Sequence, residues 1–200
     1  MDEGLLYAQL TGGSAPRQHL PRHRPRPRFF AYLLPFRFPR ADATARGMAL
    51  QSFTDPRWSR CDLKTTMLLP GVLAKRDAAA RGAEEALFVG PDGSVREGAS
   101  TNVFLVEDDR LMTPVQSRHL LPGITRPLVA QLAAEMGRTV AHETVPLSRL
   151  LKAAEVFVTS TTLLVMPVVR IDDRPIGNGE AGPVARELAE RLRARLELQG

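Results

Sequence analysis

The chain has one cysteine, three lysines and no long apolar run. Cys61 alone cannot form an internal disulfide, which excludes a disulfide framework and is typical of a reducing cytosol. No stretch approaches the ~20 apolar residues that a membrane-spanning helix needs. The start, Met1-Asp2-Glu3-Gly4, has no basic segment of the kind that begins a secretory signal. No group of cysteines and histidines has metal-ligand spacing. We therefore expect a cytoplasmic protein without a metal site.

The composition is that of an ordinary globular protein. Hydrophobic residues make up 44% of the 200 residues and charged residues 24%. This length suffices for one well-packed domain, or for a domain and part of another.

The net charge of +5 comes from one segment. Residues 17–40 contain seven arginines and no acidic residue, and without these arginines the charge of the remaining chain is −2. Alternating proline and arginine at residues 21–28 predicts an extended loop, because proline prevents a helix. Three interpretations stay open: a solvated basic loop, a loop that captures carboxylates, or a nucleic-acid-binding arm. Within residues 17–28 no aromatic residue is available to stack on bases, which disfavours the arm.

Lysine is rare in a chain whose other 24 basic residues are arginine. Unlike arginine, lysine can lose its proton and attack a carbonyl. Lys75 and Lys152 lie in sequences typical of helix surfaces, whereas Lys64 is flanked by small and apolar residues. Loss of water there would favour the neutral, nucleophilic amine. The alternative is a lysine that extends into solvent from a strand end.

Apolar periodicity predicts strands and helices in an irregular order. We expect helices at residues 67–81, 125–136, 147–153 and 183–198, the first with Leu68, Val72, Lys75 and Ala79 on helical spacing. Strands are expected at residues 5–10, 29–36, 46–53, 84–89, 94–97, 101–106, 110–113, 139–145, 155–160 and 167–171. Because the order lacks a regular βαβ rhythm, we predict a mixed α+β, barrel-like domain.

Four segments occur in a fixed order: Arg60–Leu69, Val95–Phe104, Leu120–Arg126 and Val156–Thr162. In this order and spacing they resemble the class IV aminotransferases, which are the fold-type IV pyridoxal-phosphate enzymes. The resemblance covers nearly the whole chain. It implies an α+β fold with a pseudo-barrel cofactor domain, pyridoxal 5'-phosphate as cofactor, and a homodimer that acts on an amino acid and a 2-oxo acid.

The same resemblance implies roles for individual residues. Lys64 matches the family's Schiff-base lysine and Glu97 matches the carboxylate that binds the pyridine nitrogen. The residue alone favours the interpretation of Glu97 as an exposed strand-end glutamate. The remaining implied cofactor contacts are Ser100 beside Glu97, Leu121 against the ring, Ile124 and Thr125 at a helix start suited to phosphate, and Ser160 and Thr161 in a second phosphate-binding turn. Leu121 could also be ordinary core, and Thr125 a simple helix cap.

Arg17 and His19 bear on substrate choice. Arginine binds carboxylates bidentately, and a histidine two residues further along an extended loop points to the same side. The Arg-x-His pattern resembles the D-amino-acid aminotransferases, in which this loop traps the substrate carboxylate in the neighbouring subunit. It implies transamination of D-amino acids. A branched-chain aminotransferase and an aminodeoxychorismate lyase are the alternatives within the family. Gly12, where that group often has arginine, is a departure.

The resemblance also implies two domains. We assign residues 1–42 to the remnant of a small N-terminal α/β domain and residues 43–200 to the large cofactor domain. The family's small domain begins about 80 residues earlier, so we expect an N-terminally truncated copy or a misassigned start. The strands at 5–10, 29–36 and 46–53 are expected to be what remains of the small domain's sheet. An inactive remnant or a basic binding protein is the alternative outside the enzymes.

Overall fold

The computed structural model describes residues 4–20 and 25–196. Its internal contacts divide the chain into two units, residues 1–38 and 39–200. The domain boundary expected between residues 42 and 43 falls inside α1 (Ala41–Arg46), a short helix that the sequence did not predict. Arg22 and Arg24 of the basic loop, and residues 197–198 of the last expected helix, lie outside the described residues.

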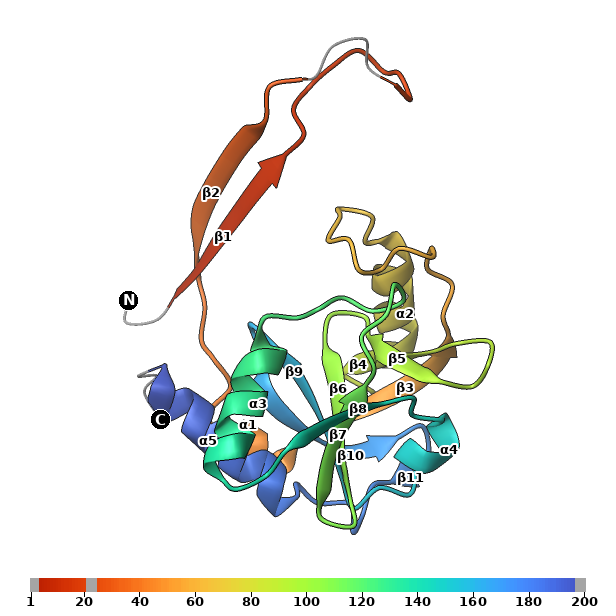
Figure 1. The fold of residues 1–200 in the computed structure, drawn as a ribbon, viewed down its shortest axis with the longest axis vertical. Helices are drawn as coiled ribbons and strands as arrows, with labels where there is room; N and C mark the ends of the chain where they lie inside the picture. The colour runs from red at the N-terminus through yellow and green to blue at the C-terminus, as the bar shows by residue number, and fades with distance from the viewer. Residues whose placement is uncertain (1–3, 21–24, 197–200) are drawn as a thin grey trace. The chain divides into compact units, whose positions relative to one another are not determined.

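The first unit is a two-stranded hairpin, drawn in red and orange in Figure 1. Strands β1 (Gly4–Thr11) and β2 (Arg28–Pro35) pair antiparallel, with Gly4 opposite Pro35 and Thr11 opposite Arg28. The Tyr7 ring stacks against the Tyr32 ring across the strands, with centroids 5.1 Å apart. Every residue of β2 is exposed. The hairpin therefore has no buried core of its own among the described residues.

The second unit is built on one mixed sheet of nine strands. Its order is β5-β4-β3-β10-β9-β6-β7-β8, with β11 paired to β10. The strands span Met48–Thr54 (β3), Glu85–Val89 (β4), Val95–Gly98 (β5), Asn102–Glu107 (β6), Arg110–Pro114 (β7), Val140–Glu143 (β8), Glu155–Ser160 (β9), Leu164–Ile171 (β10) and Arg174–Pro175 (β11). The expectation that residues 46–53 belong to the small domain's sheet is wrong, because β3 pairs in parallel with β4 and β10.

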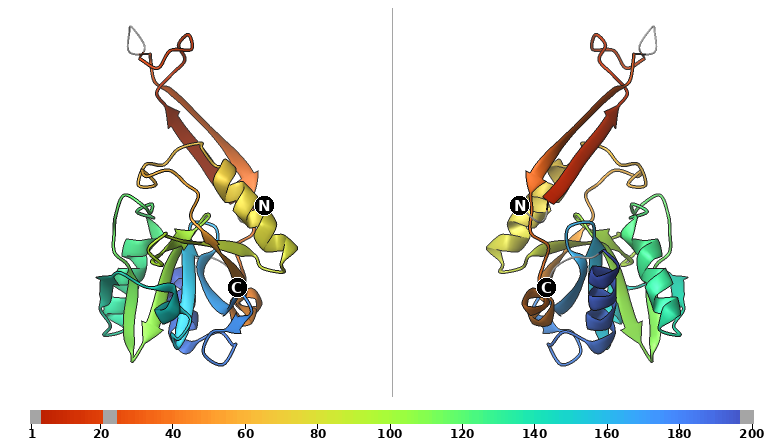
Figure 2. Two further views of the ribbon diagram at one scale, coloured as in Figure 1. Left: turned by 90° about the vertical axis from the view of Figure 1, so that its right-hand side faces the viewer. Right: turned by 90° about the vertical axis from the view of Figure 1, so that its left-hand side faces the viewer.

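The sheet curls until its two edges meet. The Val95 N–H of β5 donates to the Val145 carbonyl, just after β8, at 2.7 Å, and the Leu147 N–H donates to the Gly93 carbonyl at 3.0 Å. Figures 1 and 2 show the strands wrapping in this way. These bonds close the sheet into a half-barrel, which confirms the expected pseudo-barrel α+β fold.

Alternation along the strands separates two apolar clusters. Leu50 of β3 and Leu87 of β4 belong to the main interior cluster, whereas their neighbours Ala49 and Phe88 belong to a second cluster on the other face. All four side chains are buried. Because one face fills the barrel and the other carries a helix, the buried parts of these strands, residues 48–50 and 86–89, are continuous apolar runs.

Four further helices cover the sheet: α2 (Leu69–Ala80), α3 (Thr125–Glu135), α4 (Leu147–Leu150) and α5 (Pro183–Arg195). α3 and α5 lie side by side, while α2 packs on β3 and β4 (Figure 2). The expected helix forms, but the residues noted for their helical spacing are not its buried face: Val72 is exposed, whereas Ala74 and Ala78 are buried. None of the described helices is both long and apolar enough to cross a membrane.

Candidate active site

A cavity of about 600 Å³ lies in the second unit, where several chain segments meet. It is formed by the loop after β3, the turn from β5 to β6, the loop before α3 and the end of β9. All eight residues that the sequence assigned to the lysine and cofactor site line it: Lys64, Glu97, Ser100, Leu121, Ile124, Thr125, Ser160 and Thr161. Segments about 100 residues apart are thus brought to one cavity.

Lys64 lies in the loop that joins β3 to α2, and its side chain is exposed. Its apolar neighbours Leu63 and Met67 are also about half exposed. The desolvated setting that the sequence suggested for Lys64 is therefore wrong for the described chain. The lysine instead extends from a loop at the edge of the cavity, where its amine has room to react.

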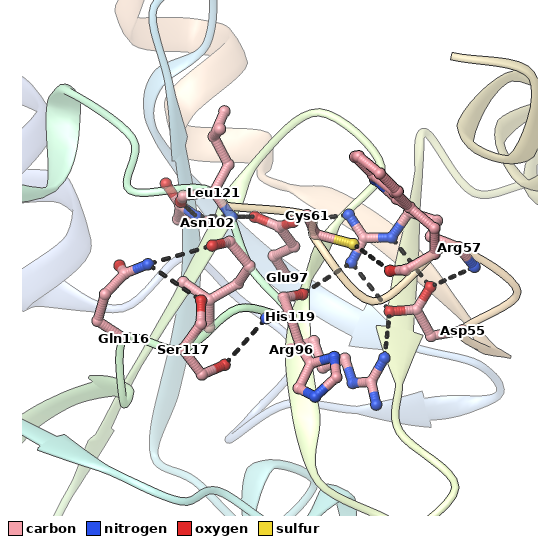
Figure 3. Close-up of polar contacts among 12 residues, drawn as sticks. Asp55, Arg57, Cys61, Arg96, Glu97, Asn102, Gln116, Ser117, His119 and Leu121 are labelled. Atoms are coloured by element: carbon pink, nitrogen blue, oxygen red, sulfur yellow. Dashed lines mark hydrogen bonds and ion pairs between the residues drawn. The ribbon is translucent and has the colours of Figure 1, made fainter. Parts of the chain in front are cut away.

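Glu97 is only 4% exposed and sits near the end of β5. Its Oε1 accepts a hydrogen bond from Arg57 Nη1 at 2.6 Å. Its Oε2 accepts from Asn102 Nδ2 at 3.1 Å and from the Leu121 N–H at 2.9 Å (Figure 3). The interpretation of Glu97 as an exposed strand-end glutamate is therefore wrong. The carboxylate is a fixed, buried wall of the cavity.

Two opposing effects act on the charge of Glu97. Burial raises the pKa of its carboxyl, because loss of water disfavours the ionised form, and the Arg57 guanidinium lowers it. The net direction is a pKa above the ordinary value of 4.5. A carboxylate in this balance is suited to pairing with a cationic ring nitrogen.

The start of α3 also lines the cavity. Its helix cap is Ile124, which makes no side-chain capping bond, so the interpretation of Thr125 as a cap is wrong. The Arg126 N–H donates to the Gly123 carbonyl at 3.1 Å, and Pro127 has no N–H. The N–H groups of Ile124 and Thr125 are therefore the candidates of this first turn for a phosphate.

The turn after β9 adds hydroxyls to the same cavity. Ser160 Oγ accepts the Leu163 N–H at 3.0 Å and lies 3.3 Å from Thr162 Oγ1. Thr161 is exposed at the cavity edge. The turn is thus held by Ser160, and Thr161 is accessible from the cavity that it lines.

Ser100 is engaged elsewhere. Its hydroxyl donates to Glu85 Oε2 at 2.6 Å, and Lys75 Nζ lies 3.4 Å from the same carboxylate oxygen. The Glu85 side chain is fully buried. Ser100 lines the cavity but fixes the turn from β5 to β6 through this contact.

Arg17 and His19 belong to the first unit. Both side chains are exposed in the segment that follows β1. Their predicted role in substrate binding stays a prediction.

Sequence reasoning missed two residues of the site, Arg57 and Asn102. Asn102 Nδ2 donates both to Glu97 and to the Leu121 carbonyl, the latter at 3.0 Å, and so joins the carboxylate to the loop before α3. It stands in the recognised segment Glu97–Asn102, where its polar type at the start of a buried strand was an available signal. Nothing in the local pattern around Arg57 distinguishes it from the other arginines.

Comparison with known proteins identifies the family of this chain. The model of the family Amino-transferase class IV matches residues 1–171, and the chain belongs to that family. The D-alanine aminotransferase of Bacillus licheniformis is 38% identical over 190 residues, which are 95% of this chain and 66% of that protein. The chain thus spans about two thirds of the length of such relatives.

Solved structures of proteins with two other activities have the same fold. The T.th. branched-chain amino acid aminotransferase with pyridoxamine 5'-phosphate superposes with a TM-score of 0.89 at 30% identity, over 98% of this chain and 66% of that one. A putative 4-amino-4-deoxychorismate lyase from Legionella pneumophila gives 0.82 at 25% identity, over 96% and 69%. The fold is therefore common to members with different reactions.

Proposed function

We propose that the second unit holds pyridoxal 5'-phosphate and that the protein is a transaminase of D-amino acids with a 2-oxo acid as acceptor. The observation that carries the proposal is the single cavity onto which Lys64, the buried Glu97 carboxylate and the start of α3 all open. This donor set fits the cofactor: an amine for the aldehyde, an anion for the pyridine nitrogen, and N–H and hydroxyl groups for the phosphate.

Each residue then has a defined task. Lys64 Nζ would hold the cofactor, and once displaced by substrate it would accept the proton from the substrate α-carbon. Glu97 would bind the pyridine nitrogen, while Ile124, Thr125, Ser160 and Thr161 would hold the phosphate. Leu121 would pack against the ring and Ser100 would shape the turn beside it. When bound, the cofactor supplies an electron sink for the charge left on the α-carbon.

The preference for D-amino acids rests on Arg17 and His19 and on the similarity to a D-alanine aminotransferase. We propose a cytoplasmic homodimer in which these two residues reach the active site of the neighbouring subunit. There they bind the carboxylate of the substrate. We likewise propose that residues 1–42 belong to a small domain and residues 43–200 to the cofactor domain. A preference for branched-chain L-amino acids is the second candidate, supported by the solved branched-chain enzyme.

Borohydride trapping tests the cofactor assignment. The chain is incubated with pyridoxal phosphate, reduced and digested, and the labelled peptide is identified by mass spectrometry. We expect the label on Lys64, with Lys75 and Lys152 as internal controls in the same molecule. A label confined to either control residue would overturn the assignment.

Enantiomer assays test the substrate. Purified protein is assayed with D-alanine, L-leucine and L-valine, each with 2-oxoglutarate as acceptor, and with D-glutamate with pyruvate as acceptor. The proposal predicts turnover of the D-amino acids, and Arg17→Ala should raise KM for them. Clear preference for L-leucine or L-valine would assign the branched-chain reaction instead. Cofactor trapping without turnover of any of these would support a non-catalytic remnant.

A further inference from the structure

A chain of four alternating charges ends at Glu97. Arg96 Nη1 bonds to Asp55 Oδ2 at 2.9 Å, and Asp55 binds Arg57 through both carboxylate oxygens, at 2.9 and 3.0 Å. Arg57 Nη1 then reaches Glu97 Oε1 at 2.6 Å. Figure 3 shows Arg57 between the two carboxylates. The side chains of all four residues are at most 15% exposed.

The position of Arg57 is fixed from several sides. Asp55 holds Nε and Nη2 of its planar fork, the His119 carbonyl accepts from Nη2 at 3.3 Å, and the guanidinium carbon lies 4.4 Å from the centre of the Phe88 ring. Only Nη1 is directed at Glu97. Arg57 therefore approaches Glu97 through one nitrogen and does not enclose it in a bidentate pair.

The consequence concerns the acceptor positions of Glu97. A carboxylate has about four lone-pair positions. In the described chain, Oε1 uses one of them for Arg57, and Oε2 uses two, for Asn102 and the Leu121 N–H. One position on Oε1 remains for a donor in the cavity that Glu97 lines.

We propose that Arg57 is a positioning residue, which keeps the Glu97 carboxylate ionised and fixes its orientation, while Asp55 and Arg96 hold Arg57 in place. The inference about Arg57 and Glu97 stands on their contacts alone. It rests on the proposed function only in naming a pyridine nitrogen as the donor that Glu97 receives.

Other charged groups act on Glu97 as well. Asp55, behind Arg57, raises the pKa of Glu97, and the Cys61 thiol and the Arg126 guanidinium are within electrostatic reach. Among these groups only Arg57 makes a direct ion pair with Glu97. Removal of Arg57 should therefore raise the pKa of Glu97, whereas loss of a more distant group should have a smaller effect.

The test measures the protonation of Glu97 directly, in the 200-residue chain without cofactor. Glutamate carboxyls are labelled with ¹³C and titrated by NMR, and the Glu97 signal is assigned by its absence in Glu97→Gln. Arg57→Met should raise the titration midpoint by about 1–3 pH units, the range typical of a lost arginine partner. Arg57→Lys keeps the charge and should restore most of the difference.

Arg60→Met is the matched control, because Arg60 lies three residues away in the same loop but pairs with Asp62, at 2.9 Å. The titration midpoint of Glu97 in Arg60→Met should equal that in the parent protein. If Arg57→Met does not fold, as judged by circular dichroism, Arg57→Gln supplies the neutral variant with a donor retained. A midpoint in the folded neutral variant equal to the parent's overturns the inference. Since no cofactor is present, this result is independent of borohydride trapping at Lys64.

Discussion

Strands that contain similar residues are exposed in the first unit of this protein and buried in the second. β2, with the sequence RFFAYLLP, is exposed at all eight positions, whereas the five residues of β4, EALFV, are all buried. Both strands contain aromatic or β-branched residues of high β-propensity: Phe29, Phe30 and Tyr32 in β2, and Phe88 and Val89 in β4. The difference lies in pairing: β4 lies between two strands and under a helix, whereas β2 has a single partner in the described residues. Composition thus predicts a strand but does not determine how deeply it is buried.

Amide hydrogen exchange should show the largest contrast between the units. A two-stranded hairpin is marginally stable by itself, so amides of β1 and β2 should exchange through local opening, and those of β9 and β10 only through global unfolding. We expect at least ~10³-fold slower exchange for the central strands. Exchange followed by mass spectrometry measures this. Equal protection in β2 would mean that another surface covers the hairpin in solution.

Aromatic truncation sharpens the same comparison. Phe157 is fully buried and stacks on Phe104 with centroids 5.0 Å apart, whereas Phe30 is 45% exposed in the hairpin. Phe157→Ala should lower the free energy of unfolding by about 3–5 kcal/mol. Phe30→Ala should stay within about 0.5 kcal/mol of the parent. Urea unfolding monitored by circular dichroism tests both. A large loss for Phe30→Ala would show that its ring is covered.

Asp55 provides a comparison of buried and exposed ion pairs. Burial raises the pKa of Asp55, but Arg57 and Arg96 outweigh it, so the pKa lies below the ordinary 3.8. The ionised Asp55 carboxylate therefore stabilises the folded protein fully well above pH 3.8. This stabilisation is lost as the pH falls through the lower pKa that Asp55 has in the folded protein. Asp55→Asn should cost about 1.5–3 kcal/mol at pH 7, and the difference from the parent should shrink in acid.

Asp42→Asn is the control, because Asp42 pairs with Arg46 at 3.0 Å on the surface of α1 with both side chains 70% exposed. Thermal melts of both variants are recorded at pH 7 and in acid. The melting temperature of Asp42→Asn should not differ significantly from that of the parent. Equal effects of the two substitutions would contradict the importance of burial.

The smallest expected effect is on the rate at which a thiol reagent labels Cys61. This residue lines the cavity but is only 8% exposed. Burial raises the pKa of its thiol above the ordinary 9.0. At pH 8 a thiol reagent should label Cys61 more slowly than free cysteine, and labelling should accelerate as the pH rises. Absorbance of the released chromophore follows the reaction. Labelling as fast as free cysteine would mean that the loop before α2 opens readily.

Much of the local structure could be predicted from the chain. Expected strands and helices coincide with the described ones within a few residues, since period-two and helical patterns are local properties. α1 was missed because the six residues Ala41–Arg46 are too few to show a helical period. The sequence did not indicate which face of α2 is buried, because alanines pack closely against β4 while larger apolar residues occupy the other face.

The candidate site likewise has a part that the sequence predicts and a part that it does not. The four motif segments named the residues that line the cavity, because their side chains carry the required chemical groups. The burial of Glu97 and its contact with Arg57 forty positions earlier were not predictable. The polar type of Asn102 was a signal for that residue, but not for the contacts by which it bridges Glu97 and Leu121. These contacts depend on which strands become neighbours, and that information is not local.

The sequence by itself determined the order of most elements and the inventory of reactive groups: one lysine among small and apolar neighbours, one carboxylate after a turn, and hydroxyls at a helix start and a strand end. Only the tertiary structure decided that β3 joins the large sheet, that the sheet closes between Val95 and Val145, and that Arg57 rather than solvent accompanies Glu97. Strand pairing and burial result from contacts between distant segments, and their energies depend on the whole packed core.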